Sequence, residues 1–82
     1  MGVRSQVTIA LALERAELAI KMLLGDEITE YVKPLYIRHK TLNIASLNPA
    51  AASYIGRVQD EILEYVNQGV AKPIAERIRV IS

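Results

Sequence analysis

Along this chain the spacing of apolar residues switches between two periods. Over residues 7–24 they recur every three or four positions, which predicts an amphipathic helix. From Pro34 the spacing falls to two, as in a β-strand, and it returns to three or four after Asn48 and to two after Ile74. The sequence therefore predicts the order helix, strand, strand, helix, strand.

The first predicted helix carries more apolar surface than one stripe needs. Its stripe is formed by Ile9, Leu13, Ala16, Ile20 and Leu23. Three further apolar side chains, Leu11, Leu18 and Met22, widen this surface, so we expect the helix to pack on a sheet and to touch a second helix or a partner. Ser5 or Thr8 is the expected N-cap, and Gly25 suits the left-handed position after the helix.

A hairpin is predicted after the first helix. We expect Asp26 to cap a short turn that runs to about Tyr31 and stops at Pro34. The alternation then places core-facing residues on one side of two strands (Leu35, Ile37, Leu42 and Ile44) and the others on the opposite side (Tyr36, Arg38, Asn43 and Ala45). The turn lacks Asn-Gly or Asp-Gly, so its type stays open.

The second half of the chain adds a helix and a strand. Asn48-Pro49 is a strong helix start, and the stripe of Ala51, Ile55, Val58, Ile62 and Val66 predicts one long helix ended by Gly69. Ile74, Ile78 and Val80 then lie opposite Arg77, Arg79 and Ile81 in a third strand. We predict one α+β domain over residues 1–82, a two-layer sandwich whose three-stranded sheet is covered on one face by two helices. The neighbour of the third strand stays open.

The composition argues against an enzyme. The chain has no Cys and one His, no Gly-rich phosphate loop and no nucleophilic serine motif. His39 lies in the predicted turn without a nearby carboxylate, and the acidic clusters are typical of solvated helix faces. We therefore expect no catalytic residue, no metal and no cofactor. The longest apolar run, residues 9–13, is too short to span a membrane, and no secretory signal precedes it, which favours the cytoplasm and no membrane partner.

The net charge of +1 conceals an uneven distribution. The segments 1–31 and 48–68 carry four basic and eight acidic residues, a sum of −4. The segments 32–47 and 69–82 carry six basic residues and one acidic residue, a sum of +5. The strands and their loops are therefore the basic part of the chain.

A basic sheet face with an aromatic ring is suited to single-stranded nucleic acid, because bases stack on Tyr and Arg while phosphates pair with Arg and Lys. The candidate nucleic-acid-binding residues are Tyr36, Arg38, Lys40, Arg77 and Arg79. An ordinary solvated face, or an edge protected by charge against aggregation, would give the same pattern. A protein-interaction or self-associating domain without nucleic-acid binding, using the wide apolar surface of the first helix, is a second interpretation. A KH-like RNA-binding factor is a third.

Several short motifs follow one another in a recognisable order. They are Gly25 after a helix, Pro34-Leu35 opening a hairpin, Leu42-Asn43-Ile44, the pairs Ile62-Leu63 and Val66-Asn67 near a helix end, and the strand with Ile74, Ile78 and Val80. In these features the stretch from about Ile20 to Val80 resembles the DciA-like family, bacterial proteins associated with the replicative helicase.

The resemblance implies a KH-like αββαβ domain that takes part in helicase loading during DNA replication and can contact DNA. The replicative helicase and single-stranded DNA or RNA are then the expected partners. The chain lacks the Trp residues that family members often carry near Ala50-Ala51-Ala52 and before Gly25. It also lacks the Gly-x-x-Gly loop of true KH domains, so their RNA clamp is not implied.

Overall fold

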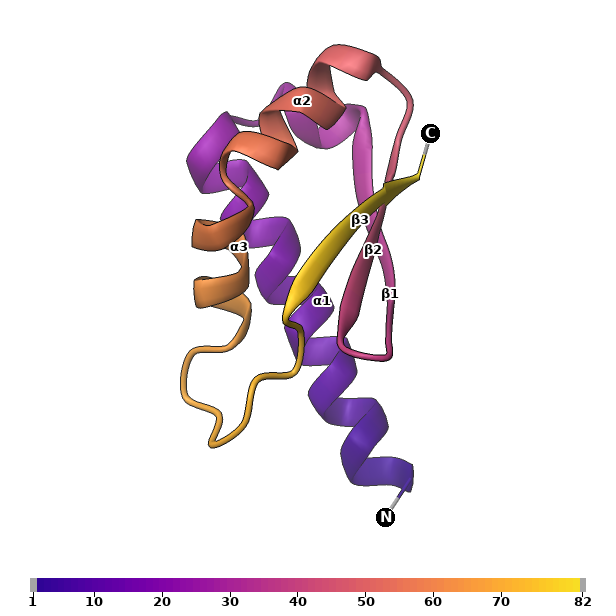
Figure 1. The fold of residues 1–82 in the computed structure, drawn as a ribbon, viewed down its shortest axis with the longest axis vertical. Coiled ribbons are helices and arrows are strands. Elements are labelled where there is room, and N and C mark those ends of the chain that lie inside the picture. Colours follow the sequence, from indigo (N-terminus) through magenta and orange to yellow (C-terminus); the bar gives the residue numbers. More distant parts are fainter. Residues whose placement is uncertain (1, 82) are drawn as a thin grey trace.

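A computed structural model describes the backbone of residues 2–81 and the side chains of residues 8–81. Its elements are α1 (Gly2–Leu24), the 3-10 turn η1 (Ile28–Glu30), β1 (Val32–Arg38), β2 (Thr41–Ser46), α2 (Pro49–Arg57), α3 (Gln59–Val66) and β3 (Arg77–Ile81). Figure 1 shows α1 and α3 running beside each other and the twisted sheet lying against α1. The α+β class and the three-stranded sheet are thus confirmed, whereas the KH-like arrangement stays a prediction. Over the described residues, no helix is long and apolar enough to cross a membrane.

The sheet has the strand order β1-β2-β3. β1 and β2 form the predicted antiparallel hairpin, and β3 lies parallel to β2. Two parallel neighbours need a long crossover connection, and the segment that contains α2 and α3 supplies it. The third strand therefore joins β2, which the sequence had left open.

A β-bulge in β1 changes which residues face the core. Pro34 pairs with Ile44 and Tyr36 pairs with Asn43, so Leu35 is one extra residue in the ladder. Pro34 is buried before the bulge, Ile37 packs against the core after it, and Leu35 is 43% exposed. The prediction that Leu35 shares the core face with Ile37 is wrong, because the bulge interrupts the alternation between them.

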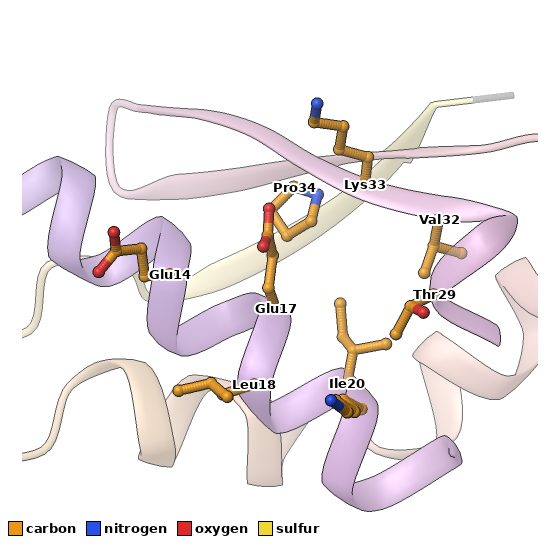
Figure 2. A pocket seen from close by; sticks show the side chains of 9 residues that line it. Glu14, Glu17, Leu18, Ile20, Thr29, Val32, Lys33 and Pro34 are labelled. Carbon is orange, nitrogen blue, oxygen red and sulfur yellow. The ribbon is translucent and has the colours of Figure 1, made fainter. Parts of the chain in front are cut away.

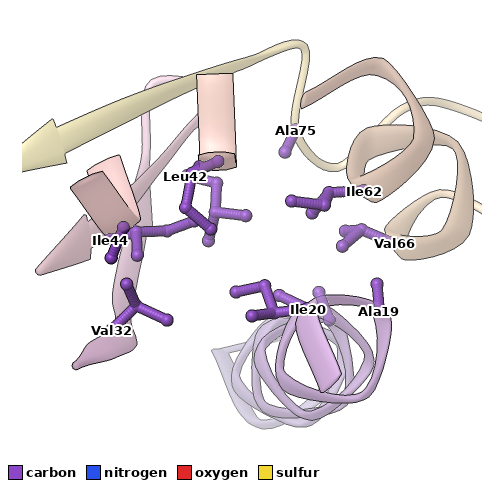
Figure 3. Close-up of a cluster of buried hydrophobic side chains, with 12 residues drawn as sticks. Ala19, Ile20, Val32, Leu42, Ile44, Ile62, Val66 and Ala75 are labelled. Carbon is purple, nitrogen blue, oxygen red and sulfur yellow. The ribbon is translucent and has the colours of Figure 1, made fainter. Parts of the chain in front are cut away.

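The helix α1 begins earlier than predicted and buries smaller residues. Ser5 and Thr8 lie inside the helix, so neither is its N-cap. Its fully buried residues are Ala12, Ala16, Ala19 and Ile20, whereas Leu23 of the predicted stripe is 42% exposed. Small alanine side chains let α3 approach α1 closely, and Figure 3 shows Ala19 and Ile20 pointing towards the buried residues of α3 and the sheet.

The second predicted helix is broken in two at Val58. This residue has φ −114° and ψ 17°, and its N–H donates to the Ile55 carbonyl at 3.2 Å, one residue nearer than in a regular α-helix. Gly56 and the β-branched Val58 both have low helix propensity. The break lets α2 contact β2 while α3 packs along α1, and the apolar stripe still continues from Ile55 to Ile62.

The expected signals at Asn48 and Gly25 are observed, whereas Asp26 does not cap with its side chain and the second helical segment ends at Val66, before Gly69. The Asn48 side chain accepts hydrogen bonds from the N–H groups of Ala50 and Ala51 at 2.8 and 3.3 Å, as expected for an N-cap. Gly25 adopts the expected positive φ of 93°. The carbonyl of Asp26, rather than its side chain, accepts from Thr29, and its carboxylate lies 3.7 Å from Lys21.

The hairpin turn contains a testable strain. His39 and Lys40 have φ 52° and 60°, which is the conformation of a type I′ turn formed here by two residues other than glycine. The left-handed backbone conformation costs a residue with a side chain about 1–2 kcal/mol relative to glycine. Glycine removes this strain, but it also raises the conformational entropy of the unfolded chain, which offsets part of the gain in stability. We expect Lys40→Gly to stabilise the fold by about 0.5–1 kcal/mol in urea denaturation. An equal or lower stability would show that the Lys40 side chain contributes more than the strain costs.

Candidate nucleic-acid interface

The sheet turns one face towards the helices and leaves the other open to solvent. Leu42 and Ile44 of β2 are fully buried beneath the helices, and Ile78 and Val80 of β3 pack against the same core. The alternation of β-strands directs their neighbours to the opposite face. The open face therefore belongs to Thr41, Asn43 and Ala45 of β2 and to the residues paired with them.

The register arranges the open face in three rows across the sheet. In the first row Thr41 lies between Arg38 and Arg77, and in the second Asn43 lies between Tyr36 and Arg79. In the third row Ala45 lies between Lys33 and Ile81. The two outer strands thus carry the cations and the ring, and the central strand carries small residues. Because neighbouring strands lie about 4.8 Å apart, the two outer strands are roughly 9.6 Å apart.

The structure brings four of the five candidate residues together. Tyr36, Arg38, Arg77 and Arg79 line one shallow groove with His39, Thr41, Asn43 and Ile78. Lys40 lies outside this lining, in the adjoining turn, where its carbonyl accepts from the N–H groups of Glu76 and Arg77 at 2.7 and 3.3 Å. Lys40 therefore lies at the end of the groove and ties the hairpin turn to the start of β3.

Polar contacts fix the floor of the groove. The Thr41 hydroxyl accepts a hydrogen bond from Nε of Arg77 at 3.2 Å, which leaves the outer guanidinium nitrogens of Arg77 directed away from this contact. The Asn43 side chain is only 5% exposed, and its amide donates to the Thr41 carbonyl at 3.1 Å. These hydrogen bonds hold Arg77 in position beside the Thr41 and Asn43 side chains, which already have partners within the chain.

Among the residues whose side chains are described, no acidic group pairs with the cations of this face. The strands β1, β2 and β3 contain no Asp or Glu. Over residues 8–81, whose side chains the structure describes, the ion pair found joins Lys21 of α1 and Asp26, outside the open face. Arg38, Arg77 and Arg79 are exposed. The open face is therefore a cationic surface that is available to an anionic ligand.

An asparagine outside the face holds β3 in place. Asn67 follows α3, and its side-chain oxygen Oδ1 accepts from the N–H groups of Ile74 and Ala75 at 2.7 and 3.2 Å. Its amide donates to the Ala75 carbonyl at 2.7 Å. Ala75 is buried, so these bonds anchor the segment that leads directly into Arg77. We refer to these three bonds as the Asn67 clamp.

Sequence reasoning missed several of these contributors. Thr41 follows from the strand alternation, because it lies two residues from Asn43, whereas Lys33 shares a face with Tyr36 only because of the bulge between them. The contribution of His39 to the groove and the Asn67 clamp had no local signal, since both depend on residues that the fold brings together.

Comparison with known protein families gives one further finding. The sequence model of the family described as "Dna[CI] antecedent, DciA" matches residues 3–80, which is nearly the whole chain. A search of the curated proteins found no match.

Proposed function

Because the chain belongs to the DciA family, we propose that it is a non-catalytic module of DNA replication that binds single-stranded DNA on the open face of its sheet. Membership of this family indicates a role as a loader of the bacterial replicative helicase, and its members are loaders rather than catalysts. The replicative helicase is accordingly the protein partner that we propose, with the cytoplasm as the place of action.

The observation that carries the DNA proposal is the composition of the open face. Arg38, Arg77 and Arg79 surround Tyr36 on a surface whose strands contain no acidic residue. Guanidinium groups pair with phosphates, and an exposed tyrosine ring offers a face on which a base stacks. The Tyr36 side chain is 45% exposed, which leaves such a face accessible.

The geometry favours a single strand over a duplex. The bases of a duplex are stacked on one another, so a ring on a protein surface reaches a base face only where the strand is unpaired. The cations of β1 and β3 flank a floor of small residues, so one backbone can lie along either strand while its bases turn towards Tyr36 and Asn43.

Fluorescence anisotropy with labelled oligonucleotides tests this proposal. Single-stranded DNA should bind saturably at low salt, and four phosphate contacts, from Arg38, Lys40, Arg77 and Arg79, predict a slope of log K against log salt of about −2.8. The affinity then falls about fiftyfold between 50 and 200 mM salt. Tighter binding to RNA of the same sequence would favour the RNA-binding alternative. No binding at low salt would contradict the proposal.

The aromatic contact makes a separate prediction. Tyr36→Ala should weaken binding of single-stranded DNA about tenfold, because one base loses its stacking partner, whereas Tyr36→Phe should keep most of the affinity. The salt slope should stay the same in both variants, since neither removes a charge. Equal loss in both variants would mean that the hydroxyl, and not the ring, makes the contact.

A further inference from the structure

The outward side of α1 carries apolar side chains that stay about half exposed or more in the described structure. Leu11, Leu18 and Met22 are 51%, 49% and 64% exposed. Their spacing of seven and four residues places them in one line along the helix. The buried residues Ala12, Ala16 and Ala19 lie on the side that faces α3. We call Leu11, Leu18 and Met22 the outer stripe.

Several exposed apolar side chains in one line have a different meaning from single exposed apolar side chains scattered over a surface. Leu47 is 83% exposed in the connection between β2 and α2, but it is a single side chain and needs no explanation. The outer stripe instead extends over three turns of a regular helix. Apolar side chains aligned on one side of a helix are typical of a surface that pairs with another helix.

Charged residues flank the outer stripe in a specific order. Glu14 and Lys21 lie seven residues apart on one flank, and both line a hollow between α1 and β1. Figure 2 shows Glu14, Glu17 and Leu18 on α1 at this hollow, opposite Lys33 and Pro34 of β1. On the other flank Arg15 donates to the Gln68 carbonyl, so its guanidinium is drawn towards the end of α3.

We propose that the outer stripe docks α1 of a second copy of this chain, with the two helices antiparallel. A two-fold axis near the middle of the stripe then sets Leu11 against Met22 of the second copy and brings the two Leu18 side chains together. On the flank, Glu14 faces Lys21 of the second copy, and the symmetry repeats this ion pair. In a parallel two-fold dimer this flank would face the opposite flank of the second copy, where Arg15 is drawn towards the end of α3, so Glu14 meets Lys21 only in the antiparallel arrangement.

The same features indicate a reversible dimer. Three side chains from each copy bury less than the roughly 1,200 Å² of a stable complex, so the dimer should form only at high protein concentration. Because the outer stripe belongs to α1 and the cationic face lies on the far side of the sheet, docking leaves the proposed DNA site open. This inference therefore stands independently of the proposed function.

Sedimentation of the full chain from about 10 µM to 1 mM tests the proposal. The apparent mass should rise towards twice the monomer mass, and Leu18→Glu should weaken the association at least tenfold. Leu47→Glu is the matched control, since it places the same charge on a more exposed leucine outside the stripe. A wild-type chain that stays monomeric throughout, or a Leu18→Glu variant that associates like wild type, would overturn the proposal.

The ion pairs give a second, independent test of the geometry. Glu14→Lys should weaken the dimer by placing two lysines opposite each other, and the double variant Glu14→Lys with Lys21→Glu should restore it. If the single and double variants associate equally, the antiparallel pairing is wrong. Both substitutions lie on the exposed side of α1, and unchanged circular dichroism would confirm that the variants are folded.

Discussion

The double variant Arg77→Glu with Arg79→Glu should bind single-stranded DNA about thirtyfold more weakly than the wild-type chain, a loss of roughly 2 kcal/mol. The two arginines are neighbours on one side of β3, and both line the groove on the open face. The substitutions remove two phosphate contacts and add two negative charges beside the remaining cations. Fluorescence anisotropy at constant salt measures the change.

The salt dependence of the same variant identifies the mechanism. Each phosphate contact to a single strand contributes about 0.7 to the slope of log K against log salt, so the loss of two contacts should reduce the slope by about 1.4. A uniform loss of affinity with an unchanged slope would point instead to a distorted sheet. Such distortion is the main alternative to exclude, because Arg77→Glu also removes the hydrogen bond from Nε of Arg77 to the Thr41 hydroxyl, which joins β3 to β2.

A matched charge reversal on the helices provides the control. Lys21→Glu with Arg57→Glu changes the net charge by the same amount, and both positions are exposed on helices rather than on the sheet. This control should lose far less affinity than the β3 variant. Equal losses would mean that binding responds to net charge alone, and an unaffected, folded β3 variant would reject the sheet-face site.

Asn67→Ala should destabilise the fold by about 3 kcal/mol. The substitution removes all three bonds of the Asn67 clamp and leaves the N–H groups of Ile74 and Ala75 and the Ala75 carbonyl without these partners in a partly buried place. For a domain of this size, such a loss lowers the melting temperature by roughly 15 °C. Thermal and urea unfolding followed by circular dichroism measure both quantities.

Two neighbouring variants separate the clamp from general effects. Asn67→Asp keeps an acceptor for the two N–H groups but cannot donate to the Ala75 carbonyl, so its stability should fall between those of wild type and Asn67→Ala. Gln68→Ala changes the adjacent exposed position and should cost less than 0.5 kcal/mol. If Asn67→Ala and Gln68→Ala are equally stable, the clamp does not hold the entry to β3.

The parts of the fold that the sequence predicts correctly are those coded by residues close together. Asn48-Pro49 marks a helix start because the cap bonds reach only two and three residues ahead. Gly25 marks a helix end for the same local reason. The alternation in β2 and β3 is also local, and it correctly places Asn43, Arg77 and Arg79 on the open face.

The incorrect or open predictions concern two kinds of structural feature. Some leave the pattern of apolar residues unchanged, and others depend on contacts between residues that are distant in the sequence. The stripe through Ile55 and Ile62 is the same for one helix and for two, so the break at Val58 is invisible in it. The bulge at Leu35 appears only when β1 is aligned with β2. The place of β3 beside β2 depends in part on Asn67 and on the Lys40 carbonyl, which are remote from β3 in sequence.

The most direct test of the central proposal is an NMR titration of the isotope-labelled chain with a short single-stranded DNA. The account predicts that the amide signals that move most belong to β1, β2 and β3, above all around Tyr36, Asn43 and Arg79, while those of α1 and α3 stay nearly constant. Shifts concentrated on the helices, with the sheet signals unchanged, would contradict it.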